Sequence, residues 1–425
     1  MNDPRPPSLW RDDDFRRLWA GQTASQLGAH ACQVILPLVA VVALNADPHQ
    51  TGALRAVQQA PILLLSLLVG AWVDRRRSRT VMVLADSGRA VVLAVVPAAY
   101  LLGLLDIPLL LLVAFLVGVL TVYFDVAYHA CLVRLVRRGQ LAQGNSALEG
   151  SGSAARIAAP ALGGALVSLL SAPIALAASA FFFTLSFLSI QRIRRPEPMP
   201  EPPSAREAGV WRQIHEGLRL VAGNASLRAV GISSALFQFS FAAFMTVYLL
   251  FLPRTLHLSG VAIGLVLAAM GPGALVGSVL AATLPARYGY GVVMVSAAVL
   301  ADGVMLCVPA LHGSSALTVA ALMAVNFLFG VFSQVVDVTV VTVRQAITPI
   351  PLQGRVVATV NFLGMGLTPL GSLLGGHLAG VAGPRTSLLL AAVALALSPL
   401  FMATSPLARL GRNLPGTADG LARPH

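Results

Sequence analysis

The chain alternates long apolar runs with short polar breaks along almost its whole length. A run of about 20 apolar residues is what an α-helix needs to cross the hydrocarbon layer of a membrane. The pattern therefore predicts twelve membrane-spanning helices. They are expected at residues 18–44, 52–73, 80–104, 109–132, 145–170, 174–191, 229–252, 261–284, 290–311, 316–341, 356–381 and 385–404.

One long polar segment divides these runs into two sets. It contains several prolines and charges of both signs, which argue against another span and favour a linker with a short surface helix near residues 211–221. We expect an all-α integral membrane protein with two pseudo-symmetric six-helix bundles. Its parts would be an N-terminal arm (1–17), an N-terminal bundle (18–191), a linker (192–228), a C-terminal bundle (229–404) and a polar tail (405–425).

The composition also indicates a membrane protein, and in a membrane protein the net positive charge has a different explanation than in a soluble one. Only 11% of the residues are charged, against about 25% in soluble domains. The formal charge of +12 would suggest nucleic acid in a soluble protein. Here every basic residue is Arg, and among the loop arginines only Arg55, Arg254 and Arg385 fall on the minority side. This is the positive-inside pattern, and it places both termini in the cytoplasm with no nucleic-acid partner.

The two halves of the chain align weakly with each other at nearly one spacing. Thr80-Val-Met-Val aligns with Val292-Val-Met-Val, Arg75 with Arg287, and Asp125 with Asp337. Internal repeats of this kind place a substrate site near the membrane midplane, and rocking of the halves gives alternating access.

A charged stretch lies between the second and third apolar runs. It reads Gly70-Ala-Trp-Val-Asp74-Arg75-Arg76-Arg77-Ser78-Arg79. One interpretation is a loop whose arginines only fix topology. The other is a charged latch between two helices that stabilises one state of a transporter.

Twelve predicted spans, a central linker and this charged stretch together resemble the major facilitator superfamily. The match to its signature loop is carried by Gly70, Asp74, Arg75 and Arg79, whereas Arg77 and Ser78 depart from it. The resemblance implies a transporter in which an acid of the fourth span meets an arginine of this loop. The latch candidates are Gly70, Asp74, Arg75, Arg79, Asp86, Arg89 and Asp125.

Further stretches resemble one branch of that superfamily. Ala159-Pro160-Ala-Leu-Gly163-Gly164 is similar to the motif of drug/proton antiporters, carried here by Pro160, Gly163 and Gly164. Residues 15–22, 141–146, 344–349 and 354–356 resemble efflux permeases that include macrolide and enterobactin exporters. The resemblance implies proton-coupled export.

Ionisable groups inside the predicted spans are candidates for a structural or functional role, because inserting them into a membrane costs free energy. Asp86 and Arg89 are either a structural pair or part of the latch. The proton-coupling candidates are Asp125, His30 and Glu149. For each of these a structural alternative stays open: a latch contact for Asp125, neutral packing for His30, and a pair with Arg156 for Glu149.

Amides and aromatic rings at helical spacing suit a broad lipophilic cavity, although they also suit helix packing. The cavity-lining candidates are Gln26, His30, Gln33, Tyr123, Gln238, Phe241, Asn326 and Gln334.

No catalytic set, phosphate-binding loop or metal-ligand spacing is recognised, so we expect no enzyme activity, cofactor or metal. The cysteines Cys32, Cys131 and Cys307 lie far apart. We predict a monomeric secondary transporter of the cytoplasmic membrane that exports small amphipathic compounds, such as a drug, antibiotic or siderophore, in exchange for protons. Two alternatives are a dedicated metabolite or lysophospholipid transporter and a non-transporting membrane sensor or scaffold.

Overall fold

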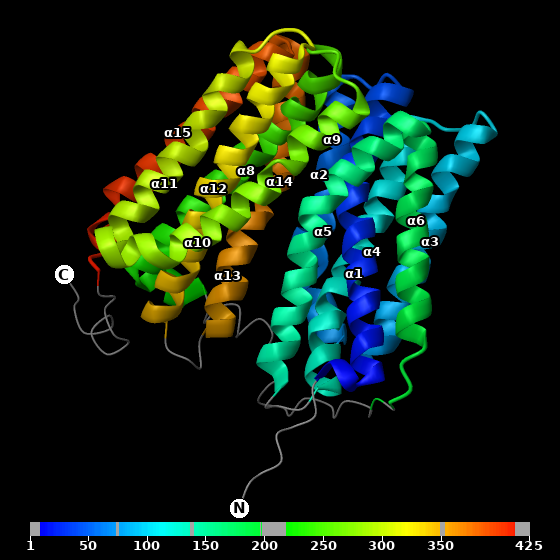
Figure 1. Ribbon diagram of the computed structural model, residues 1–425, viewed down its shortest axis with the longest axis horizontal. Coiled ribbons are helices and arrows are strands. Elements are labelled where there is room, and N and C mark those ends of the chain that lie inside the picture. Colours follow the sequence, from blue (N-terminus) through cyan, green and yellow to red (C-terminus); the bar gives the residue numbers. More distant parts are fainter. Residues whose placement is uncertain are drawn as a thin grey trace, which may run out of the picture. The chain divides into compact units, whose positions relative to one another are not determined.

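The computed structural model describes residues 9–73, 76–136, 140–195, 197, 218–348 and 353–412, and all regular elements in these residues are helical (Figure 1). The first half contains η1 (Leu9–Arg11), α1 (Asp13–Leu38), η2 (Val39–Ala43), α2 (Pro48–Val73), α3 (Ser78–Leu101), α4 (Ile107–Leu135), α5 (Leu141–Leu169) and α6 (Ala172–Gln191). The second half contains α8 (Ala225–Arg254), α9 (Gly260–Ala268), α10 (Met270–Tyr288), α11 (Tyr290–Val304), η4 (Met305–Ala310), α12 (Ala316–Ile347), α13 (Gln353–Gly366), α14 (Thr368–Ala382), α15 (Pro384–Thr404) and η6 (Pro406–Arg409).

These helices follow the apolar runs of the sequence. Within the described residues, ten helical segments are long and apolar enough to cross a membrane. Helix α2 and the pair α13–α14 occupy the other two predicted runs. Of the predicted linker helix, residues 218–221 lie in a described helical segment, and residues 211–217 lie outside the described residues.

Two runs that were predicted as continuous spans are interrupted, and a proline follows each interruption. The eighth run breaks after Ala268, and the eleventh breaks after Gly366. Pro272 and Pro369 follow within the next turn. A proline lacks an N–H donor, and its ring clashes with the carbonyl four residues earlier, so a helix bends or ends there.

The internal repeat has a regular structural form. Helix α1 begins at residue 13 and α8 at residue 225, a separation of 212 residues. The same separation joins the first residues of α2 and α9, α3 and α11, α5 and α13, and α6 and α15, and the last residues of α4 and α12. Even the N-caps correspond, because Asp12 accepts hydrogen bonds from the first turn of α1 and Asn224 does so for α8.

The contacts divide the chain into two compact units. The first comprises Met1–Leu44 and Ala60–Ser204, and the second Asn45–Gln59 and Ala205–His425. In the first unit α1 packs on α5 and α6, and α3 packs on α4 and α6 (Figure 1). In the second unit α8 packs on α13, α14 and α15, and α12 packs on α10 and α11.

Small residues allow close helix packing in the second unit. A Cβ atom added to Gly273 or Gly277 of α10 would collide with the backbone of α12. The start of α2 belongs to this unit and also packs closely through glycine. A Cβ atom on Gly52 would lie 2.8 Å from Cα of Gly376 in α14. In lipid, such packing replaces the hydrophobic drive that assembles soluble cores.

Candidate functional site

A buried ion pair lies at the centre of the first unit. Asp86 and Arg89 are three residues apart on α3 and form a salt bridge with side-chain exposures of 0% and 1%. The hydroxyl of Ser25 on α1 joins them: Arg89 Nη2 donates to Ser25 Oγ (3.0 Å), which donates to Asp86 Oδ1 (3.3 Å). The pair therefore neutralises its own charge where a lone ion would be costly.

The guanidinium of Arg89 also connects neighbouring helices. It lies 4.5 Å from the ring centroid of Phe124 on α4 and 4.2 Å from that of Phe183 on α6. Aromatic faces attract a cation at such distances. Its Nη1 donates a long hydrogen bond (3.5 Å) to Thr121 Oγ1. Arg89 thus links α1, α3, α4 and α6.

Asp125 lies one residue beyond Phe124, and its side chain is exposed. The carboxyl group is within electrostatic range of both Arg89 and Asp86. The first unit therefore combines a buried, internally neutral pair with an accessible carboxyl group beside it. An arrangement of this kind can hold a proton or interact with a mobile cation.

The predicted latch is only partly described. Asp74, Arg75 and the side-chain surroundings of Gly70 lie outside the described residues. The side chain of Arg79 donates to the carbonyl oxygen of Gln191 at the end of α6. No ion pair joins Arg79 to Asp125 within the described part of the chain.

An acid that the sequence analysis did not select lies at the start of α3. The carboxylate of Glu197 accepts hydrogen bonds from the backbone N–H groups of Ser78 (2.8 Å) and Arg79 (3.0 Å) and from Arg134 Nη1 (2.7 Å). Arg134 also donates to the hydroxyl of Ser78 (2.8 Å). An anion at a helix N-terminus is stabilised by the helix dipole and by the unpaired N–H groups.

The residues just before Glu197 are held at the same end of the unit. Asp14 accepts hydrogen bonds from the backbone N–H groups of Arg194 and Arg195, both at 2.9 Å. The side chain of Arg195 pairs with Asp12 (3.0 Å) and donates to the carbonyl oxygen of Leu135 (2.6 Å). In the sequence, the only sign of these contacts at the start of α3 is the acid Glu197, which comes directly after an arginine-rich segment.

The polar candidates on α1 lie near α5. His30 and Gln26 are half-buried, and Gln33, which is exposed, hydrogen-bonds to His30. His30 also lies within electrostatic range of Arg156. Glu149 and Arg156 are both exposed, and the ion pairs of the described residues do not include one between them.

The antiporter-like motif lies in the middle of α5. Pro160 is half-buried, and Gly163 and Gly164 are buried. A Cβ atom on Gly163 would lie 3.2 Å from Cγ1 of Ile35 on α1. The motif glycine therefore allows α5 and α1 to approach closely.

The aromatic candidates of the second unit form a stack. Phe241 of α8 stacks on Phe237 (centroids 5.5 Å apart) and on Phe329 of α12 (5.4 Å). Asn326, another cavity-lining candidate, is fully buried, and its Nδ2 donates to the hydroxyl oxygen of Tyr248 (2.8 Å). The same Nδ2 donates to the carbonyl oxygen of Leu322 (2.9 Å), whereas Oδ1 has no hydrogen-bond partner in the described part of the chain.

The other lining candidates are less enclosed. Gln238 and Gln334 are half-buried in α8 and α12. Tyr123 of α4 is half-buried and meets the ring of Trp72 edge-on at 5.4 Å. These three side chains therefore retain accessible surface.

Comparison with known proteins agrees with this architecture. Residues 6–416 match the family described as transmembrane secretion effector. The multidrug efflux pump Tap of Mycolicibacterium fortuitum is 28% identical over 337 residues, which cover 77% of this chain and 80% of that protein. Among solved structures, a bacterial homologue of the human lysosomal transporter Spinster aligns with a TM-score of 0.70 at 14% identity, covering 96% of this chain and 98% of that one.

A second solved structure is equally similar in fold. The nucleoside transporter NupG aligns with a TM-score of 0.70 at 16% identity, covering 92% of this chain and 100% of that one. The fold and the family match together confirm the predicted twelve-span, two-bundle architecture. The chain belongs to the transmembrane secretion effector family and is a multi-pass transporter of the major facilitator superfamily, not an enzyme.

Proposed function

We propose that the protein exports small amphipathic compounds across the cytoplasmic membrane by alternating access, in exchange for protons. The observation that carries this proposal is the match of residues 6–416 to a family of secretion effectors. The similarity to a multidrug efflux pump over 80% of that pump's length supports the direction of transport and the substrate class. The arginine distribution supports cytoplasmic termini, and the protein would act as a monomer.

Proton coupling is assigned first to Asp125. Its carboxyl group is exposed and lies beside the charges of Arg89 and Asp86. A proton arriving at Asp125 changes the charge next to a pair that links four helices, and so it can bias their packing. His30 and Glu149 are the further proton-carrying candidates, and both retain accessible surface.

The conformational latch is assigned to Asp74, Arg75 or Arg79, and Asp125, which would stabilise the outward-facing state. The match of Gly70, Asp74, Arg75 and Arg79 to the superfamily loop supports this assignment. Asp74→Asn should shift the equilibrium toward the inward-facing state and reduce transport. Unchanged transport together with unchanged accessibility of the cavity from the cytoplasm would contradict the latch.

The function is tested by efflux of a fluorescent amphipathic dye from preloaded cells. Cells that produce the protein should lose dye faster than empty-vector cells, and a protonophore should abolish the difference. Asp125→Asn should slow efflux at equal expression, whereas Asp13→Asn, an exposed acid on α1, should not. Efflux that continues after the proton gradient is collapsed would refute the coupling.

A further inference from the structure

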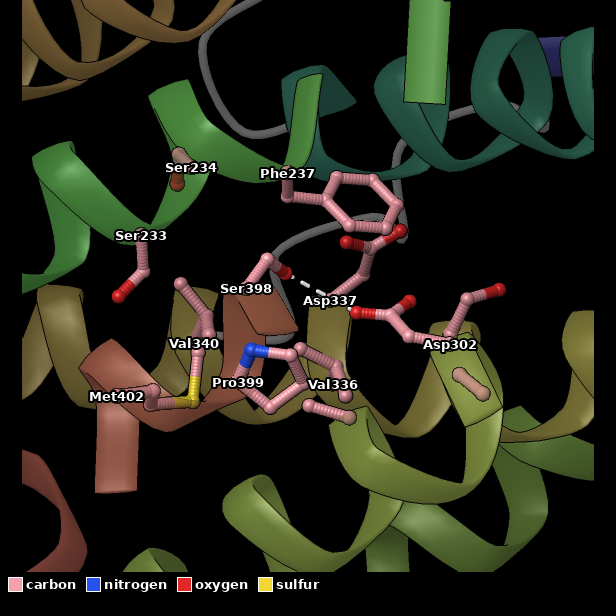
Figure 2. Close-up of a pocket in the computed structure, with 13 residues that line it drawn as sticks. Ser233, Ser234, Phe237, Asp302, Val336, Asp337, Val340, Ser398, Pro399 and Met402 are labelled. Carbon is pink, nitrogen blue, oxygen red and sulfur yellow. Dashed lines mark hydrogen bonds between the residues drawn. The ribbon is translucent and has the colours of Figure 1, made fainter. Parts of the chain in front are cut away.

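A small, partly open cavity in the second unit is lined by residues of α8, α11, α12 and α15 (Figure 2). Its volume is about 80 Å³. A water molecule needs roughly 10–15 Å³ on this kind of measure, and pockets for drug-sized ligands occupy about 300–1,000 Å³. The cavity therefore suits an ion or a few water molecules and is too small for an amphipathic substrate.

The oxygen atoms that line the cavity come from two acids and four serines. They belong to Asp302, Asp337, Ser233, Ser234, Ser333 and Ser398. Figure 2 shows the carboxyl group of Asp302 directed toward Ser398, and that of Asp337, which is exposed, beside the ring of Phe237. Asp302 is 2% exposed and accepts a hydrogen bond from Ser398 Oγ (3.1 Å).

The internal repeat explains why this cavity exists. At the separation of 212 residues, Asp337 corresponds to Asp125, and Ala301 corresponds to Arg89. In the first unit the guanidinium of Arg89 fills the space between α3, α4 and α6. In the second unit the methyl group of Ala301 stands in its place and lines the cavity. The repeat thus keeps the acid at Asp337 and has alanine at the position of the arginine.

No cation of the described residues pairs with Asp302. Within the described residues it forms no salt bridge, and Ser398 is its hydrogen-bond partner. Of the cavity-lining residues, α11 contributes Asp302 and α12 contributes Asp337, whereas those from α8 and α15 carry no titratable group. The hydroxyl oxygen of Ser233 is buried and has no hydrogen-bond partner in the described part of the chain. A buried carboxylate without a cation binds a proton or a metal ion, because an isolated charge there is too costly.

We propose that Asp302, Asp337, Ser233 and Ser398 form a binding site for one small monovalent cation, either a proton or a sodium ion. The site belongs to the second unit, whereas the proton-coupling candidates belong to the first. Its importance for transport rests on the proposed antiport, since the bound cation would be a coupling ion. The binding itself does not depend on that function.

The test measures cation binding without transport. The thermal unfolding midpoint of the purified protein is recorded across a pH series, and across sodium chloride concentrations with choline chloride at equal ionic strength. A ligand that binds only the folded state raises the midpoint as its concentration rises. We expect the midpoint to rise by at least about 2 °C, either on acidification or with sodium. The first result identifies the proton and the second the sodium ion.

Three variants address the site directly. Asp302→Asn keeps the shape of the side chain and removes its charge, so the response should disappear. Ser398→Ala should weaken it. Ala301→Arg supplies the guanidinium that the repeat carries at Arg89, and it should abolish the response. Asp13→Asn, an exposed acid of the first unit, should retain the full response.

The outcomes separate this site from the proposed function. A wild-type midpoint that responds to neither cation, or a response that Asp302→Asn retains, overturns the site even if dye export occurs. A response lost in Asp302→Asn supports the site even if no dye is exported. If Ala301→Arg fails to fold, Asp302→Asn and Ser398→Ala still decide the matter.

Discussion

Arg89 connects four helices of the first unit through its side chain. It is fully buried, pairs with Asp86, and contacts rings of α4 and α6. Arg89→Met leaves Asp86 charged and unpaired, and we expect it to lower the free energy of unfolding by about 3–5 kcal/mol. Denaturation of the purified protein, followed by fluorescence, measures this loss.

A double variant separates pairing from packing. Asp86→Asn combined with Arg89→Met removes both charges, and it should be less destabilised than Arg89→Met alone. The loss of free energy of unfolding in the double variant is compared with the sum of the losses in Asp86→Asn and Arg89→Met. If the two are equal, the ion pair does not explain the role of Arg89.

The sequence predicted part of this cluster. A spacing of three residues on a helix brings Asp86 and Arg89 onto one face, so their pairing could be anticipated. Ser25 and Phe183 are contributed by helices distant in the chain, and no local pattern identifies them. Asp302 was missed because it has no charged neighbour at helical spacing, and its relation to Asp337 appears only when α11 and α12 pack together.

At the scale of single elements, the beginning of α3 depends on Glu197. Its carboxylate caps the first N–H groups of the helix and pairs with Arg134 of α4. Glu197→Ala and Arg134→Ala should each lower the free energy of unfolding by about 0.5–2 kcal/mol. Because both act through one contact, the double variant should be little worse than either single one. Additive losses would show that the two residues act independently.

Glycine substitutions test how closely the helices pack. A Cβ atom on Gly277 of α10 meets the backbone of Val331, which cannot move aside as a flexible side chain can. Gly277→Ala should therefore destabilise the protein by about 1–3 kcal/mol. Gly150→Ala is the matched control, because nothing lies within 4 Å of its added Cβ. There the better helix propensity of alanine should stabilise α5 by up to about 1 kcal/mol. Similar midpoints for both variants would contradict the packing argument.

The extent of the spans was predictable from hydropathy, and the breaks within them were not predicted. Apolar runs give the positions of helices to within a few residues, since membrane thickness sets their length. The interruptions after Ala268 and Gly366 depend on the prolines that follow. Pro160 lies inside α5 without ending it, so proline alone does not decide where a membrane helix breaks.

At the scale of the whole molecule, the arginine distribution predicts which end of each unit faces the cytoplasm. Arg77 lies between α2 and α3, and Leu104 lies between α3 and α4; both are exposed. In a background with the exposed Cys307 replaced by Ser, an impermeant maleimide should label Leu104→Cys in intact cells and spare Arg77→Cys. Permeabilised cells should label both. The reverse pattern in intact cells would invert the topology.

The two repeats of the molecule share their helix positions but not their charged groups. Helices correspond at a separation of 212 residues, yet the chemistry of the two units differs. The first unit carries a self-neutralised pair, and the second carries acids around a small cavity.

Proton-driven export can be measured with purified protein in liposomes and a permanently cationic fluorescent dye. Under an imposed gradient with an acidic interior, outward proton flow should drive dye into the lumen. Accumulation should stop when a protonophore collapses the gradient, and Asp125→Asn should reduce it. Equal dye uptake with and without the gradient, or equal uptake by protein-free liposomes, would contradict the account.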